Sequence, residues 1–206
     1  MSIRPDSPVV RRAAAADVPA IVKMLVRAFD DDPVATFMFA GTRRRRLGLH
    51  SFFTSQLRRQ YLPHGHVYVT EDLSGAALWA PPERTRHPVA ELLQLFPTAP
   101  YLASPHTIDA LRFMFQVESL HPTDRHWYLF TIGTDPDRQG RGVGSALLRT
   151  VLAHIDEEGD PAFLESSKEQ NVPLYARFGF KVMDQVPSKR GSPPLWRMWR
   201  EPMVPP

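Results

Sequence analysis

The chain reads Arg138-Gln139-Gly140-Arg141-Gly142-Val143-Gly144-Ser145-Ala146 between a predicted strand at residues 126–133 and a predicted helix that begins near Gly142. At such a junction several backbone N–H groups have no partner inside the helix, and the helix dipole adds partial positive charge beside them. Glycines let a ligand approach the backbone without a Cβ in the way. The segment therefore predicts a binding site for a phosphate or pyrophosphate group.

The spacing of the glycines separates the candidate ligands. A P-loop requires G-x-x-x-x-G-K-[ST], and no Lys-Ser or Lys-Thr pair follows these glycines. A dinucleotide fingerprint requires G-x-G-x-x-G, and Ser145 stands where its third glycine should be. The pattern that fits is Q-x-x-G-x-G, formed by Gln139, Gly142 and Gly144. A glycine-rich connection that binds nothing is the alternative.

The amino-acid composition limits the classes of protein to which the chain can belong. The 206 residues suit one domain, with 43% hydrophobic and 23% charged residues, and the net charge of +3 is too small to indicate a nucleic-acid partner. The sequence has no cysteine, which excludes disulfides, thiolate metal sites and a cysteine nucleophile. No H-E-x-x-H pattern occurs among the histidines, so we expect no metal. No run of about 18 apolar residues occurs, so we expect a soluble, cytoplasmic protein without a membrane partner.

Hydrophobic periodicity predicts the element order. Strands are expected at residues 9–13, 66–70, 76–79, 127–132, 161–165, 180–186 and 195–200. Helices are expected from Asp17 to Phe29, at 42–61, twice within 88–121, from about 142 to 155, and at 171–178. The run Asp30-Asp31-Asp32-Pro33 is expected to stop the first helix.

Three segments in this order carry a resemblance to a known family. They are TIGTDPDRQGRGVGSALL (131–148), PAFLESS (161–167) and NVPLYARFGFKV (171–182), followed by LWRMWREP (195–202). Over residues 126–200 the chain resembles the acetyl-CoA-binding core of the GNAT acetyltransferase superfamily, and within it the puromycin N-acetyltransferase branch. The resemblance implies one α/β (α+β) domain over residues 1–206. Its mixed sheet of about seven strands would have a splayed central pair, flanking helices and a helical insertion at 88–121.

The resemblance also implies where acetyl-CoA binds as co-substrate. The backbone of Ile132, Gly133 and Thr134 would pair with the pantetheine arm, and Asn171 would touch that arm. The pyrophosphate would be held by N–H groups of Gln139, Gly140, Arg141, Gly142, Val143, Gly144 and Ser145. Arg138 and Arg141 would add positive charge, although both also suit a solvated loop. Asn171 also suits an N-cap of the last helix.

Acetyl transfer to an amine needs a proton donor for the leaving sulfur, and Tyr175 is the candidate. It lies one helical turn after Asn171, so both side chains share a face. A phenol can protonate a leaving thiolate near neutral pH. A buried core aromatic is the alternative interpretation of Tyr175.

The general base is left open by the sequence. Many relatives carry a glutamate on the strand before the glycine loop, but residues 128–132 contain no carboxylate. Glu165, at the end of the next strand, is a candidate catalytic residue, and a hydrogen-bonding anchor in the sheet is its alternative role. Asp31 and Glu118 are further candidates near the substrate, acting directly or through water.

The sequence therefore predicts an N-acetyltransferase that acts on a primary amine of a small molecule, either antibiotic-like or a metabolite. The amine would attack the thioester directly, without a covalent enzyme intermediate. Two alternatives remain: a catalytically weak acyl-CoA-binding sensor, and a protein or peptide N-acetyltransferase. A monomer and a homodimer are both consistent with the sequence.

Overall fold

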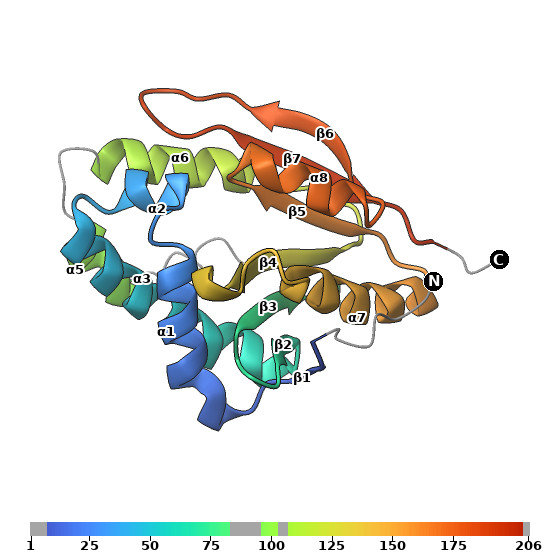
Figure 1. Ribbon diagram of the computed structural model, residues 1–206. Helices are drawn as coiled ribbons and strands as arrows, with labels where there is room; N and C mark the ends of the chain where they lie inside the picture. Colours follow the sequence, from blue (N-terminus) through green and yellow to red (C-terminus); the bar gives the residue numbers. More distant parts are fainter. Residues whose placement is uncertain (1–7, 83–95, 103–106, 204–206) are drawn as a thin grey trace.

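The structure, a computed structural model, describes residues 8–82, 96–102 and 107–203. Within these residues seven strands form one mixed sheet in the order β1-β2-β3-β4-β5-β7-β6. Helices lie against both faces of the sheet (Figure 1). The mixed sheet of about seven strands that the sequence predicts is thereby confirmed.

The strands are β1 Val10–Arg12, β2 Val67–Thr70, β3 Gly75–Ala80, β4 Trp127–Thr134, β5 Ala162–Ser166, β6 Lys181–Val186 and β7 Leu195–Arg200. The helices are α1 Val18–Ala28, α2 Pro33–Met38, α3 Thr42–Gln56, α5 Ala99–Leu102, α6 Thr107–Ser119, α7 Val143–Glu158 and α8 Val172–Ala176. A π-helical turn over Leu57–Tyr61 continues α3. Of the expected insertion at 88–121, residues 88–95 and 103–106 lie outside the described residues.

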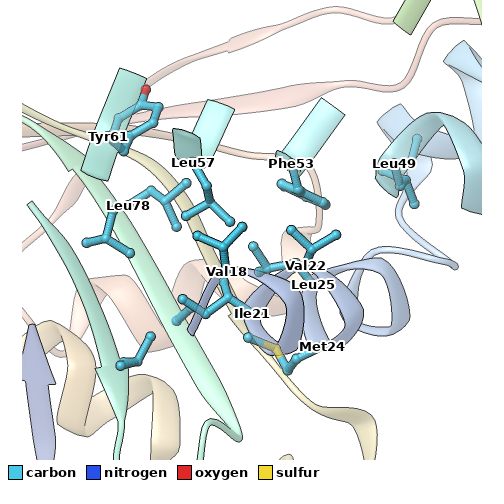
Figure 2. Close-up of a cluster of buried hydrophobic side chains, with 14 of the residues drawn as sticks. Val18, Ile21, Val22, Met24, Leu25, Leu49, Phe53, Leu57, Tyr61 and Leu78 are labelled. Atoms are coloured by element: carbon cyan, nitrogen blue, oxygen red, sulfur yellow. The ribbon is translucent and has the colours of Figure 1, made fainter. Parts of the chain in front are cut away.

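One face of the sheet is covered by α1 and α3. Apolar residues of α1 recur at helical spacing and pack on α3 and on Leu78 of β3 (Figure 2). The α1 side chains Val18, Ile21, Val22 and Leu25 are all at most 3% exposed. This packing fixes the position of the α1 C-terminus over β4.

Helix α7 covers the opposite face, beside β1–β4. Its apolar residues are buried at the spacing that the sequence predicts, from Val143 through Leu147 and Val151 to Ile155. They share one cluster with Trp79 of β3 and Trp127 of β4. The glycine segment that precedes α7 is therefore anchored by the core directly behind it.

Contact between α1 and β4 is close because residue 133 is glycine. A Cβ on Gly133 would lie 2.7 Å from Leu25 Cδ2 and 3.2 Å from Phe29 Cε2. Further along, Arg27 of α1 forms ion pairs of 2.9 Å with Asp135 and 2.8 Å with Asp137. The Arg27 guanidinium holds the pKa of Asp137 below its usual range. Helix α1 thus braces the loop that leads into the glycine segment.

The predicted stop of the first helix at residues 30–33 is confirmed, but the sequence interpretation missed the helix that begins there, since Asp32 is the N-cap of α2 and Pro33 its first residue. At the start of α1, Asp17 occupies the N-cap position, but its side chain makes no cap hydrogen bond there. Its carboxylate accepts instead from Arg11 at 2.7 Å and from the Ala14 N–H at 2.8 Å.

We expect the Asp17 contacts to make the stability of the fold depend on acidic pH. The hydrogen bond from Arg11 and the one from Ala14 lower the pKa of Asp17 from 3.8 to about 2. Because the folded pKa is the lower one, the stabilisation is complete above 3.8 and is lost as pH falls toward 2. Asp17→Asn should cost about 1 kcal/mol at neutral pH, and urea unfolding should show this cost shrinking at about pH 3. A cost that is equal at both pH values would contradict this assignment.

Candidate active site

Strands β4 and β5 are parallel neighbours that separate along their length. They pair at only three positions, Trp127 with Ala162, Tyr128 with Phe163 and Leu129 with Leu164. Beyond these, β4 continues to Thr134 against β3, while β5 continues to Ser166 against β7. The two strands diverge toward the α1 side of the molecule (Figure 1). A cleft of about 520 Å³ lies in the opening.

The divergence leaves backbone groups available to a ligand. In the described register no β5 residue faces 130–134 of β4, so this edge keeps hydrogen-bonding groups that a sheet would otherwise satisfy. A bulge in β4 adds to the irregularity, because Leu78 pairs with Thr131 and Trp79 with Leu129, and Phe130 is skipped. Bulges re-aim side chains beside functional sites. Here Phe130 and Thr131 both line the cleft.

The glycine segment closes one end of this cleft. Gly140 and Gly142 have φ values of +74° and +83°, in the left-handed region that favours glycine. The first intrahelical bond of α7 runs from the Ala146 N–H to the Gly142 carbonyl at 2.9 Å. The N–H groups of residues 143–145 therefore precede the hydrogen-bonded part of the helix. All three of these residues line the cleft.

The structure brings most of the predicted cofactor residues to this cleft. Those lining it are Ile132, Gly133, Thr134, Arg138, Gln139, Gly140, Gly142, Val143, Gly144, Ser145 and Asn171. Arg141 is exposed and is not among the lining residues. Sequence reasoning missed two further cations of the cleft, Lys168 and Arg177, because no spacing pattern marks them.

Tyr175 and Asn171 lie on the α8 side of the cleft. Asn171 is at the N-cap position of α8 without a side-chain cap bond, so capping alone does not account for its side chain. Tyr175 is buried and packs edge-on against Phe180, with 6.2 Å between ring centroids. Burial raises the pKa of Tyr175, and the negative charge of Asp32 raises it further. The phenol is therefore protonated throughout the physiological range, as a proton donor must be.

Asp32 is a buried carboxylate that sequence reasoning treated only as part of a turn. Its Oδ1 accepts from the Val34 and Ala35 N–H groups at 2.9 and 3.2 Å, and its Oδ2 accepts from Ser167 Oγ at 2.5 Å. The side chain of its neighbour Asp31 is 81% exposed and forms an ion pair with Lys168 at 2.7 Å. Asp32 therefore lies between the start of α2 and the end of β5, while Asp31 lies at the outer rim.

Glu165 lies at the end of β5 with its side chain 8% exposed. Its Oε2 accepts a hydrogen bond from Tyr128 Oη at 2.7 Å. Its Oε1 is 3.7 Å from Nδ1 of His121, whose side chain is 7% exposed. That Nδ1 atom has no hydrogen-bond partner among the described residues.

Two hydrogen-bonded histidines lie beside Glu165. His126 Nδ1 lies 2.6 Å from the Asp124 carbonyl oxygen, which only accepts, so this nitrogen carries a proton. His126 Nε2 lies 3.1 Å from His121 Nε2, so one of these two nitrogens donates and the other accepts. His121 Nδ1 is directed at the Glu165 carboxylate, so an imidazole nitrogen faces the candidate base.

A second cavity of about 340 Å³ adjoins the first. It is bounded mainly by apolar side chains of α2, α3, α6 and β4. The two cavities share Phe29, Asp32, Phe130, Thr131, Glu165 and Ser167. Glu118 of α6 lines this second cavity, as does Tyr128. Glu165 therefore lies where an apolar pocket opens into a cleft lined by free backbone groups.

The described part of the chain offers neither a metal centre nor a membrane span. No group of three or more histidine, aspartate and glutamate residues there could hold a metal ion. No described helix combines the length and apolar character that crossing a bilayer requires.

Comparison with known proteins gives consistent matches. The model of the acetyltransferase (GNAT) family matches residues 110–180. A structure from Corynebacterium glutamicum, described as histone acetyltransferase HPA2 and related acetyltransferase, is 30% identical with a TM-score of 0.73, covering 97% of this chain and 98% of that one. An uncharacterised N-acetyltransferase of Schizosaccharomyces pombe is 27% identical over 93% of this chain and 83% of its own length. A mycothiol acetyltransferase of Propionibacterium freudenreichii is 40% identical over 58 residues, which are 27% of this chain and 19% of that protein.

Proposed function

The chain belongs to the GNAT family of acetyltransferases, which use acetyl-CoA, and we propose that it acetylates the primary amine of a small molecule. The observation that carries the proposal is the position of Glu165 at the junction of the two cavities. The cleft would hold acetyl-CoA, and the apolar pocket would hold the acceptor. A pocket of about 340 Å³ is the size of a small-molecule site.

The residues of the cleft suit a pantetheine arm and a pyrophosphate. The open edge of β4 at 130–134 offers backbone partners for the amides of the arm. The N–H groups of Val143, Gly144 and Ser145 offer donors for phosphate oxygens at the positive end of the helix dipole. Arg138, Lys168 and Arg177 would add charge of the right sign. We propose no contact for Arg141 beyond long-range attraction.

The proposed reaction is a direct attack by the neutral amine on the thioester carbonyl carbon. Glu165 takes one proton from the ammonium before the attack and releases it to solvent after the reaction. A backbone N–H of the bulged part of β4 stabilises the oxyanion. The C–N bond forms, the C–S bond breaks, and Tyr175 protonates the departing sulfur. The second proton of the amine restores the Tyr175 phenol, so one proton is released in each turnover.

The acceptor class is supported by the quoted motifs and by α6. Similarity of residues 131–148 to the puromycin N-acetyltransferase branch supports an antibiotic-like or metabolite amine. Helix α6 contributes several side chains to the pocket, which narrows it relative to an open peptide groove. A protein amine is the second candidate acceptor, because the Corynebacterium glutamicum structure that is 30% identical is described as a histone acetyltransferase.

Release of coenzyme A from acetyl-CoA, read with a thiol-reactive dye across a panel of amines, tests the proposal. The protein has no cysteine and gives no background of its own. We expect release that depends on an added amine. Bound acetyl-CoA without release for any amine would contradict the proposal and favour an acyl-CoA sensor. Faster release with peptides than with every small amine would replace the small-molecule acceptor with a protein.

Gly142→Ala should weaken acetyl-CoA binding through the conformation at the α7 N-terminus. An alanine Cβ would meet no protein atom within 4 Å, so the cost comes from the φ of +83° rather than from crowding. We expect a loss of about 1–2 kcal/mol in stability and a raised Kd for acetyl-CoA. The matched control is Gly159→Ala at the other end of α7, where φ is +72° and no atom lies within 4 Å either. Equal Kd values for acetyl-CoA in the two variants would show that the glycine segment does not bind it.

A further inference from the structure

Aromatic rings form part of the wall of the apolar pocket. Phe130 of β4 is stacked on Tyr61 with 5.0 Å between ring centroids and tilted against Phe52 at 5.9 Å. Phe113 of α6 contributes a further ring to the lining. Such walls favour flat apolar groups, and ring faces also attract a cation.

The described charged side chains that line the pocket are all acidic. Its described lining includes three carboxylates, Asp32, Glu118 and Glu165, and no lysine, arginine or histidine. Two of these, Asp32 and Glu165, lie at the junction with the cleft. A primary ammonium would therefore be drawn to the junction, where its nitrogen meets the thioester. An anionic group on the acceptor would meet three carboxylates and no cation in this described lining.

From these two observations we infer that the acceptor is an arylalkylamine-like molecule, with one primary ammonium on a flat aromatic body and no anionic group. The inference rests on the proposed function and names its substrate class. The ring occupies the space among Phe52, Phe113 and Phe130, and the ammonium points toward Glu165. Free amino acids are disfavoured by their carboxylate. Linear polyamines are disfavoured because they carry no ring to fill the aromatic part of the pocket.

Paired substrates test the inference by differing in one group. Tryptamine and tryptophan share a ring system and differ in the carboxylate, as phenethylamine and phenylalanine do, while putrescine lacks the ring. We expect kcat/KM to favour each aromatic amine over its amino acid by at least about 100-fold, and to favour tryptamine over putrescine by a similar factor. Turnover of any amine upholds the proposed function. A kcat/KM for putrescine or for the amino acids that equals or exceeds that of both aromatic amines overturns the inference alone.

Variants of the pocket wall give an independent readout. Phe52 lines the pocket but not the cleft. Phe52→Leu keeps an apolar side chain without the ring, and it should lower kcat/KM for tryptamine about tenfold with the acetyl-CoA Kd unchanged. Leu47→Ala, on the same helix at a residue that is 47% exposed, is the control and should have no effect. An unchanged tryptamine kcat/KM in Phe52→Leu would show that the acceptor ring does not lie against α3.

Glu118→Lys tests the charge argument. This substitution replaces one of the three carboxylates by a cation and leaves the other two, Glu165 and Asp32, unchanged. The preference for tryptamine over tryptophan should fall at least about tenfold, through a raised KM for tryptamine and a lowered KM for tryptophan. A preference that stays the same in a folded variant would show that carboxylates of this pocket do not select the acceptor.

Discussion

Tyr175→Phe is expected to lower kcat about 100- to 1,000-fold while leaving the Kd of acetyl-CoA unchanged. Tyr175 lines the cleft proposed for acetyl-CoA and does not line the apolar pocket. Burial and the charge of Asp32 raise its pKa, so the phenol is in the protonated form that the proposed role of proton donor requires. Without the hydroxyl, coenzyme A must leave as an unprotonated thiolate. Steady-state kinetics together with calorimetric acetyl-CoA binding measure the two quantities separately.

Tyr68→Phe is the matched control for this experiment. Tyr68 is 7% exposed and Tyr175 is 6% exposed, both belong to the cluster beside α7, and Tyr68 lines neither cavity. Loss of its hydroxyl should leave kcat unchanged. If Tyr175→Phe keeps full kcat, or loses kcat only in proportion to lost folded protein, Tyr175 is a core aromatic and the proton comes from elsewhere.

Glu165→Gln is expected to lower kcat/KM about 100- to 10,000-fold near neutral pH. The variant preserves the shape of the side chain and an oxygen that can accept from Tyr128, but it removes the proposed base. The loss should shrink as pH rises, because a growing fraction of the amine then arrives already neutral. A pH profile of kcat/KM from about pH 6 to pH 10 measures both effects.

Tyr128→Phe separates a catalytic Glu165 from a structural one. It removes the hydrogen bond of 2.7 Å to Glu165 Oε2 and leaves the carboxylate in place. If Glu165 is the base, this variant should retain most of the activity and the wild-type response to pH. If Glu165 is an anchor in the sheet, the two variants should lose thermal stability alike, and neither loss of activity should recover at high pH.

The elements nearest the glycine segment could be predicted from sequence because local signals agree there. The apolar spacing predicts helix α7, the glycines predict the turn before it, and the apolar run predicts strand β4. All three are present and pack around the core beside α7. The expected strands at 66–70 and 76–79 are confirmed for a similar reason, since β2 and β3 form an antiparallel pair whose turn at 71–74 is flanked by short apolar runs. No local pattern encodes the separation of β4 from β5. That feature is predicted only by the resemblance of residues 126–200 to the GNAT superfamily.

The side chains around the junction of the two cavities could be predicted from sequence only in part. The sequence predicts Glu165 and Glu118 as carboxylates near the substrate, and both line the pocket. Asp32 was missed because its partner Ser167 is 135 positions away in sequence. The Asp32-Pro33 pair is a recognisable helix start, and its local signal could have identified α2. His121 carried no signal at all, since its contact with Glu165 depends on the packing of α6 against the sheet.

Mass spectrometry of the acceptor after reaction with isotopically labelled acetyl-CoA tests the central claim most directly. Purified protein, acetyl-CoA with a labelled acetyl group and tryptamine are mixed, and the labelled N-acetyl product is quantified against the coenzyme A released. The two cavities that meet at Glu165 predict one acetylated amine for each coenzyme A released, formed about 100- to 10,000-fold more slowly by Glu165→Gln near neutral pH. Coenzyme A released without any acetylated amine, for tryptamine and for every other amine tried, would contradict transfer at this junction.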